Sequence, residues 1–273
     1  MVIVSTKKKK KKWIFVKFLI SLIALIGLIY LYGTYIEPKI IKVKEYKISR
    51  AEITDNFNGF KIVHLSDIHY GRVFELTDLK KLVNKINDIN PDVVVITGDL
   101  IDRDTKMTKS TANSISEELN NISATVGKYA ISGNHDLKFD EWENIISNGG
   151  FINLNNSYDT VYKKGYNYLL IAGLSSFDDK ESIVNKNQKT QNYLNSFEKD
   201  GPIYKILLMH EADYIDELEN NPYDLILAGH SHGGQVGLPF IEDIFKPKGA
   251  TKYFKGHYSI GKSDLYVSTG IGL

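Results

Sequence analysis

The sequence predicts an α/β domain that follows one membrane-spanning helix. A long apolar run lies near the N-terminus, within residues 13–36. After it, short apolar runs alternate with segments in which apolar residues recur every three or four positions, which is the order of βαβ units in a largely parallel, buried sheet. Small clusters of Asp, Asn and His follow the short apolar runs, and sites in such sheets form at the carboxyl ends of the strands.

The N-terminal apolar run is long enough to cross a bilayer. Residues 18–36 are nineteen positions without a charge, and a spanning helix needs roughly 20. Trp13 and Tyr35 lie near the two ends of the run, where amphipathic aromatic side chains favour the membrane interface. A cleaved signal peptide usually has a shorter apolar region that ends in small residues, and a buried core helix rarely has this many uncharged positions. We therefore predict an uncleaved transmembrane anchor over residues 13–36.

Residues 1–12 should form a basic N-terminus on the cytoplasmic side. Lys7–Lys12 is an unbroken lysine run, and the positive-inside rule retains such a run in the cytoplasm. The segment 37–50 after the anchor is also basic, but less densely. The sequence therefore predicts a single-pass cell-membrane protein whose main domain lies outside the cytoplasm. The chain has no cysteine, so thiol chemistry does not indicate the compartment.

The net charge of +1 conceals a strong asymmetry. Residues 1–50 contain twelve Lys or Arg and two Asp or Glu, which leaves 22 basic and 31 acidic residues, a net charge of −9, in 51–273. An acidic domain repels long polyanions, so nucleic acid is not expected as a partner. The basic segments beside the anchor are expected to meet anionic lipid head groups of the membrane.

Strands and helices can be placed along most of the chain. Apolar residues have helical spacing from Leu76 to Ile89, and Pro91 ends that helix because proline cannot continue it. Residues 37–57 form a juxtamembrane segment, in which loose alternation over 42–48 favours an edge strand. The other expected strands are 61–65, 92–97, 128–132, 168–174, 204–209 and 225–228, and further helices are expected over 111–121 and 181–197.

Five polar clusters stand at the ends of expected strands, and they hold five of the seven histidines. Neutral imidazole and carboxylate together suit borderline divalent metals such as zinc, manganese and iron. There are enough ligands for two ions, the arrangement that hydrolyses phosphate esters. The clusters are Asp67-Ile68-His69, Gly98-Asp99, Gly133-Asn134-His135-Asp136, His210 and Gly229-His230-Ser231-His232.

In this order, the five clusters resemble the motifs of the calcineurin-like metallophosphoesterases. The resemblance covers residues 58–273, and the run 229–236 followed by Leu238-Pro239-Phe240 resembles the membrane-anchored or exported, YkuE/YaeI-like branch. It implies a four-layer αββα sandwich, here preceded by the transmembrane helix. Members of the branch usually continue with a further strand and often have Arg where Thr269 stands. A domain that is truncated at its C-terminus is therefore one of the expectations.

The resemblance also implies roles for individual residues and a pair of divalent ions, Mn, Fe or Zn. A carboxylate has two oxygens, so one residue can span two cations roughly 3.5–4 Å apart. An Asn oxygen is a ligand that adds no negative charge, which leaves the pair of ions positive where a phosphoryl group must bind. The implied ligands are Asp67, His69 and His232 for the first ion and Asn134, His210 and His230 for the second, with Asp99 bridging both.

His135 and Asp136 are the implied catalytic residues. His135 would contact the phosphate or protonate the leaving oxygen, and Asp136 would orient its imidazole. A water shared by two metals would attack phosphorus in line. We therefore expect a phosphohydrolase, most of all a phosphodiesterase, that hydrolyses phosphoester or pyrophosphate bonds. Its substrate would be a phosphorylated small molecule, lipid or envelope polymer.

Two other functions remain open. The same fold could serve as an inactive cell-surface binding module, although the ligand set is intact. An exonuclease would need a basic channel, which a domain with a net charge of −9 does not indicate. Several polar residues are expected to lie outside the ligand set: His64 and His257 as structural residues, Asp102 and Asp104 as solvated or supporting carboxylates, and Glu211 and Asp213 at the start of a helix.

Overall fold

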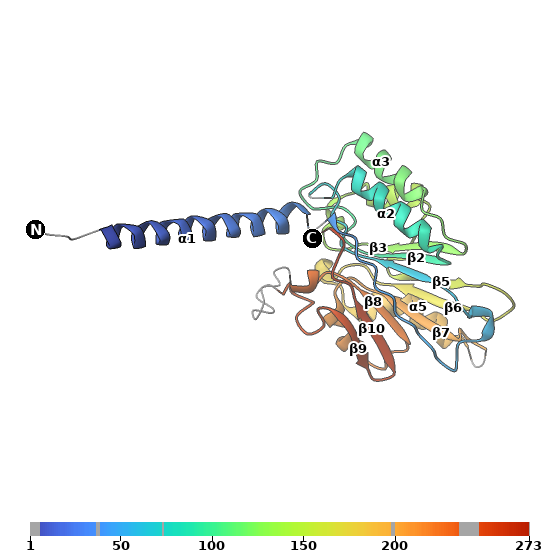
Figure 1. Cartoon of the computed structure of the whole chain (residues 1–273). Coiled ribbons are helices and arrows are strands. Elements are labelled where there is room, and N and C mark those ends of the chain that lie inside the picture. Colours follow the sequence, from blue (N-terminus) through green and yellow to red (C-terminus); the bar gives the residue numbers. More distant parts are fainter. Residues whose placement is uncertain (1–5, 37–38, 73, 198–199, 235–245, 273) are drawn as a thin grey trace, which may run out of the picture. The chain divides into compact units, whose positions relative to one another are not determined.

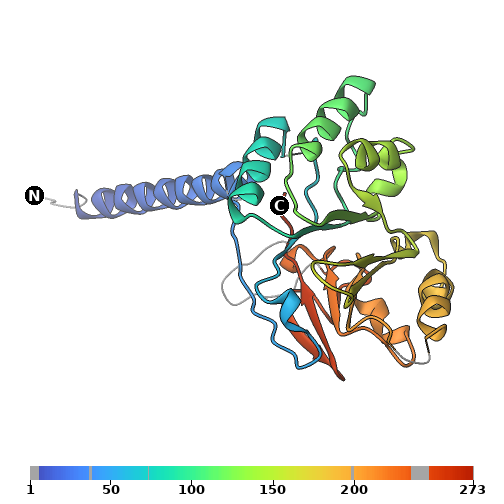
Figure 2. The same cartoon turned by 90° about the vertical axis from the view of Figure 1, so that its right-hand side faces the viewer.

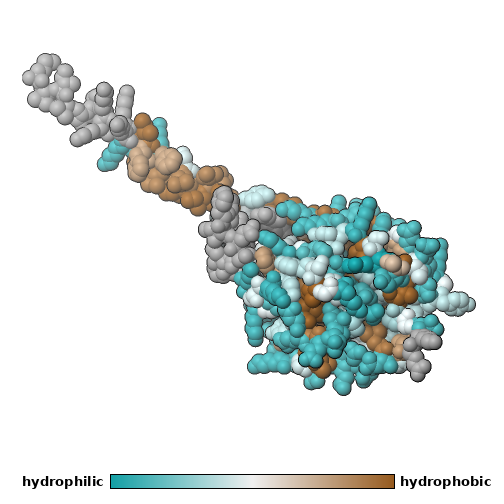
Figure 3. All heavy atoms as spheres, turned by 90° about the horizontal axis from the view of Figure 1, so that it is seen from below, coloured by the Kyte–Doolittle hydropathy of each residue, from teal (hydrophilic) through white to brown (hydrophobic). Residues whose placement is uncertain are grey.

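The computed structural model describes residues 6–36, 39–72, 74–197, 200–234 and 246–272 (Figure 1). The chain forms two compact units, Met1–Ile40 and Ile41–Leu273. In the first unit, α1 (Thr6–Leu31) continues into one π-helical turn, η1 (Tyr32–Ile36). The stretch Lys12–Ile36 is long and apolar enough to cross a membrane, and its side chains are unburied. Figure 3 shows this apolar surface along the helix.

The larger unit contains two sheets whose strands are mostly parallel. The first sheet has the order β1-β2-β3-β4 and is parallel throughout. The second has the order β5-β6-β7-β8-β10-β9, in which only the outer strands β5 and β9 run antiparallel to their neighbours. The strands are β1 (Ile62–Leu65), β2 (Val93–Thr97), β3 (Gly127–Ile131), β4 (Ile152–Asn153), β5 (Ser157–Val161), β6 (Leu169–Gly173), β7 (Tyr204–Leu208), β8 (Leu225–Ala228), β9 (Gly256–Ile260) and β10 (Ser263–Val267).

Alternate residues of the central strands build three cores, which explains the layers. On β2, Val93 and Val95 face the second sheet, whereas Val94 and Ile96 face the helices on the outer side. β8 repeats the pattern, since Leu225 and Leu227 belong to the core between the sheets. Helices α2 and α3 cover the first sheet in Figures 1 and 2. The predicted αββα sandwich is confirmed.

In the described part of the larger unit, the α-helices are α2 (Leu76–Ile89), α3 (Lys109–Asn120), α4 (Trp142–Asn148) and α5 (Ile183–Asn195). Three of these four helices lie close to their expected positions, and α4 was not expected from the sequence. α2 ends at Asn90, which adopts a left-handed conformation (φ 52°) ahead of Pro91. α3 begins at Thr108, whose side chain accepts a hydrogen bond from the backbone N–H of Thr111, a usual N-cap.

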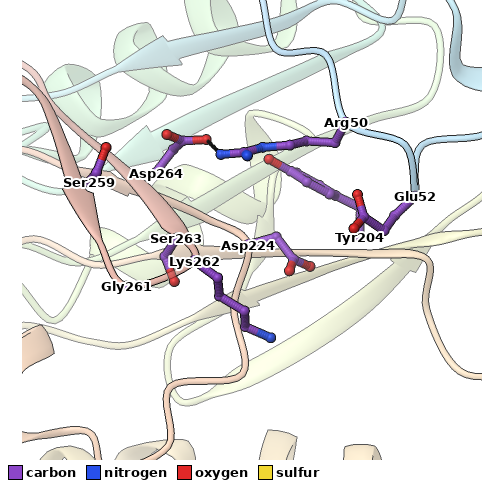
Figure 4. A pocket seen from close by; sticks show the side chains of 9 residues that line it. All are labelled: Arg50, Glu52, Tyr204, Asp224, Ser259, Gly261, Lys262, Ser263 and Asp264. Atoms are coloured by element: carbon purple, nitrogen blue, oxygen red, sulfur yellow. Dashed lines mark hydrogen bonds and ion pairs between the residues drawn. The ribbon is translucent and has the colours of Figure 1, made fainter.

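The edge strand expected over 42–48 is wrong. Residues 41–50 have no regular secondary structure, although they belong to the larger unit. The segment attaches through side chains instead of backbone pairing: Tyr46 packs on Tyr266 with ring centroids 4.6 Å apart, and Arg50 forms an ion pair with Asp264. Figure 4 shows this ion pair. The loose alternation thus reflects a few anchoring side chains between exposed lysines.

Candidate metal centre

The ligand loops follow the carboxyl ends of five parallel strands. β1, β2 and β3 lead into the loops of Asp67, Asp99 and Asn134, while β7 and β8 of the other sheet lead into His210 and His230. Gly133 allows two loops to meet, because a Cβ there would collide with the Asp99 side chain and backbone. The two sheets thereby bring all seven expected metal ligands to one site. The residues 235–240 of the branch motif lie outside the described part of the chain.

Backbone strain is concentrated at this site. Five of the seven expected ligands have φ values between 47° and 68°, in the left-handed region that few residues other than glycine adopt. Each such residue costs on the order of 1–3 kcal/mol, and it persists only where the surrounding structure enforces it. The five are Asp67, His69, Asp99, His230 and His232.

Four donor atoms converge in a first group. His69 Nε2 and His232 Nε2 are 3.1 Å apart, and the latter is 3.5 Å from Asp67 Oδ1. Asp99 Oδ2 lies 3.6 Å from His69 Nε2. Tetrahedral metal bonds of about 2.0–2.2 Å place donor atoms roughly 3.3–3.6 Å apart. These side chains therefore fit a divalent cation.

A second group lies beside the first. His210 Nε2 is 3.2 Å from Asn134 Oδ1, 3.2 Å from His230 Nδ1 and 3.3 Å from Asp99 Oδ2. Asp99 Oδ2 is therefore close to donor atoms of both groups. This shared oxygen is the geometry that a bridging carboxylate requires.

Backbone carbonyls fix the orientation of two imidazoles in the second group. His210 Nδ1 lies 2.7 Å from Thr97 O, and His230 Nε2 lies 3.1 Å from Lys248 O. A carbonyl can only accept, so each of these ring nitrogens carries the hydrogen and the other nitrogen presents its lone pair to the site. Metal-binding histidines are usually held in this way.

The buried carboxylates and imidazoles of this site shift one another's pKa values. Burial alone would raise the pKa of Asp99, but His210 and other imidazoles lower it well below its usual value. Burial lowers the pKa of His69 to about 4 despite the nearby carboxylates. His69 Nε2 and His232 Nε2 lie 3.1 Å apart, beside the carboxylates of Asp67 and Asp99. Facing ring nitrogens and acidic oxygens of this kind gain partners when a divalent ion lies between them.

The expected pairing of Asp136 with His135 is wrong. Asp136 is buried and its carboxylate accepts hydrogen bonds from the backbone N–H groups of Gly133 and Ile101, each at 3.0 Å. The carboxylate beside His135 is Asp102, whose Oδ2 is 3.6 Å from His135 Nδ1. Burial, followed by the charge of Asp99, raises the pKa of Asp136 to about 7. Asp136 thus shapes the loop, and His135 is oriented by the Arg103 backbone N–H, which donates to His135 Nδ1 at 3.2 Å.

Two residues at the site were missed from the sequence. Arg103 Nε lies 3.0 Å from His135 Nε2, and Arg72 lines the same cleft of about 500 Å³. The signal was compositional: the chain has 34 Lys and Arg, of which only 3 are Arg. Asp102, expected as a solvated or supporting carboxylate, is buried with Oδ2 3.2 Å from His69 Nδ1, and it forms with His69 and His135 a further group of side chains close enough together to hold an ion.

The remaining polar residues have structural partners. His64 Nε2 is 2.7 Å from Thr97 Oγ1, and His257 Nε2 is 2.8 Å from Asp264 Oδ1. Glu211 precedes a short 3-10 helix, as expected for a helix start.

Comparison with known proteins identifies the family. The calcineurin-like phosphoesterase family matches residues 60–234, more than half of the chain. The chain belongs to that family. It is a hydrolase that acts on phosphoester bonds, and the family is metal-dependent.

Curated relatives match over nearly the whole chain. The metallophosphoesterase YkuE of Bacillus subtilis is 34% identical over 252 residues, which cover 89% of this chain and 83% of that protein. The phosphodiesterase YaeI of Escherichia coli is 23% identical and covers 88% of this chain and 85% of its own. The UDP-2,3-diacylglucosamine pyrophosphatase LpxG of Chlamydia muridarum is 24% identical and covers 95% and 93%. These relatives support the family and the branch.

Proposed function

We propose that the protein is a two-metal phosphodiesterase that hydrolyses phosphoester or pyrophosphate bonds of a membrane- or envelope-associated substrate. The observation that carries the proposal is Asp99 Oδ2, which stands between two convergent groups of donor atoms. Asp67, His69 and His232 would hold one ion, and Asn134, His210 and His230 the other. Bound there, two divalent cations would lower the pKa of a water nucleophile and neutralise charge on the phosphoryl oxygens.

His135 and Arg103 act on the substrate from the rim of the cleft. The imidazole of His135 is 15% exposed, and its Nε2 lies between Asp99 and Arg103. The Arg103 guanidinium would bind a non-bridging phosphoryl oxygen, for which its planar donors are suited. With Arg103 turned to the phosphoryl group, His135 would hold a proton at Nε2 and donate it to the leaving oxygen, while the Arg103 backbone N–H, which donates to Nδ1 at 3.2 Å, keeps the ring oriented.

The substrate class follows from the anchor and the relatives. An apolar helix suited to a membrane precedes the catalytic unit. YaeI is a phosphodiesterase and LpxG is a pyrophosphatase of a diacylated nucleotide sugar. A phosphorylated lipid or envelope polymer therefore fits a domain held at a bilayer. The lysine run before the helix supports a catalytic domain on the extracytoplasmic side.

The test uses the full-length protein in nanodiscs, with Asp99→Asn and, as a matched control, Asp88→Asn on the exposed face of α2. After chelation, Mn, Fe, Zn or Mg is added back, and turnover of bis(p-nitrophenyl) phosphate and bound metal are measured. We expect the parent and the control to bind two ions per chain and to turn over the substrate. Asp99→Asn should lose bound metal, and its turnover should fall by a factor of about 100 or more. A folded parent that binds no metal would instead support the inactive binding module.

A further inference from the structure

The distribution of arginine in this chain is uneven. It uses lysine for almost all of its positive charge, with 3 arginines among 34 basic residues. Two of the three, Arg72 and Arg103, line the metal cleft, and the described lining includes no lysine. A guanidinium binds phosphoryl oxygens in a planar, bidentate way that an ammonium does not reproduce.

The backbone holds the Arg72 loop against the Arg103 loop. Thr105 Oγ1 donates to Tyr70 O at 2.7 Å, and Tyr70 N donates to Leu100 O at 3.0 Å. Gly71, with φ 95°, packs directly on Thr105, where a Cβ would collide with the threonine side chain. The backbones that carry Arg72 and Arg103 are thereby held side by side, and both side chains line the same cleft.

The two arginines differ in what they already contact. Arg103 lies against His135, the group closest to the scissile bond in the proposed reaction. Arg72 follows the ligand His69 by three residues, and its guanidinium has no hydrogen bond or ion pair among the described residues. Asp104 lies on the same rim and would repel an anion that approached without such a partner. A second anion binding beside the scissile phosphoryl group would therefore meet Arg72.

We propose that Arg72 binds the second phosphoryl group of a diphosphate diester, and so selects this class over single-phosphate diesters. The proposal rests on the proposed function and specifies its substrate class. Water adds to one phosphorus and the bridging P–O bond breaks. The products are two phosphomonoesters, each with one of the original phosphorus atoms, and two protons are released. Arg72 touches the phosphoryl group that leaves, at which charge accumulates as the bond breaks.

The experiment compares two soluble probes on full-length protein in nanodiscs with added metal. UDP-glucose has a diphosphate, and the p-nitrophenyl ester of thymidine 5′-monophosphate has a single phosphodiester. Arg72→Gln should lower kcat/KM for UDP-glucose by about 10- to 100-fold, the loss of one charge-assisted contact. It should change the value for the single-phosphate ester by less than about twofold. Arg72→Lys should recover part of the loss, and Lys85→Gln on α2 is the control for charge.

A binding measurement separates this proposal from the function on which it rests. The methylene-bridged analogue of UDP-glucose should bind the parent with metal by calorimetry and bind Arg72→Gln at least about tenfold more weakly. An equal loss on both esters, or no loss on either, would overturn the role of Arg72. A parent that cleaves the single-phosphate ester but neither cleaves nor binds the diphosphate would overturn the substrate class and leave the phosphodiesterase intact. A parent inactive on both would refute the proposed function itself.

Discussion

Two buried carboxylates near the metal centre have different environments and therefore different roles. Asp102 faces imidazoles, with Oδ2 3.2 Å from His69 Nδ1 and 3.6 Å from His135 Nδ1. Asp136 faces backbone N–H groups of the two loops that it joins. The family resemblance had implied Asp136, which follows His135 directly in the sequence. A residue next to an imidazole in sequence often points away from it, since the backbone turns between them.

This difference predicts distinct phenotypes for two equal substitutions. Asp102→Asn should leave the fold intact but lower kcat by about 10- to 100-fold and shift the pH profile, because the expected ligand His69 loses the carboxylate that lies 3.2 Å from its Nδ1. Asp136→Asn should instead lower the free energy of unfolding by about 1–3 kcal/mol, because an amide keeps only one of the two oxygens that accept from the buried N–H groups of Gly133 and Ile101. Thermal unfolding and pH–rate profiles of the full-length variants distinguish the two. A normal pH profile in Asp102→Asn would contradict its orienting role.

At the scale of elements, the strand ends were predictable and the packing between distant segments was not. An apolar run such as 92–97 shows its length and its last residue locally, and parallel strands then place their carboxyl ends together. Hence the parallel sheet and the places of Asp99 and His210 at strand ends follow from the sequence pattern, whereas the αββα layering was implied by the family resemblance. The segment 42–48 was misjudged because its conformation depends on Tyr266 and Asp264, more than 200 residues away.

One contact between elements predicts a pH dependence of stability. His64 on β1 meets Thr97 on β2, and burial lowers the pKa of His64 to about 4 in the folded chain from an ordinary value of 6.5. Between about pH 6.5 and pH 4, His64 is protonated in the unfolded chain but stays neutral in the folded chain. The contribution to stability is therefore full above pH 6.5 and is lost as the pH falls towards 4, by about 1–2 kcal/mol at pH 5.

His64→Gln, which retains a polar group for Thr97, should remove this component. Chemical denaturation of chelated full-length protein at about pH 7.5 and pH 5 measures it. The parent should lose more stability than the variant over that interval. Equal losses in the two proteins would show that His64 titrates normally in the folded state.

At the scale of the whole molecule, charge and hydropathy divide the chain in two. The strongly basic first fifty residues contain the helix suited to a membrane, and the remaining 223 residues have a net charge of −9. The helix was predictable because length and hydropathy are local properties. Its orientation is harder to predict, since both flanks are basic, and only the density of the Lys7–Lys12 run favours one side. The fold of the larger unit does not indicate the orientation of the helix, because the same fold can stand on either side of a membrane.

The absence of native cysteine permits a direct test of orientation. Tyr166 is 98% exposed, in the loop between β5 and β6, so Tyr166→Cys should label readily without disturbing the core. Thr6→Cys, ahead of the lysine run, reports the opposite side. In intact cells, a membrane-impermeant maleimide should label Tyr166→Cys and leave Thr6→Cys unlabelled until the cells are opened. The reverse pattern would place the metal centre in the cytoplasm. If neither variant were labelled before lysis, the catalytic domain would also lie in the cytoplasm. The substrate search would then move to the inner leaflet of the membrane.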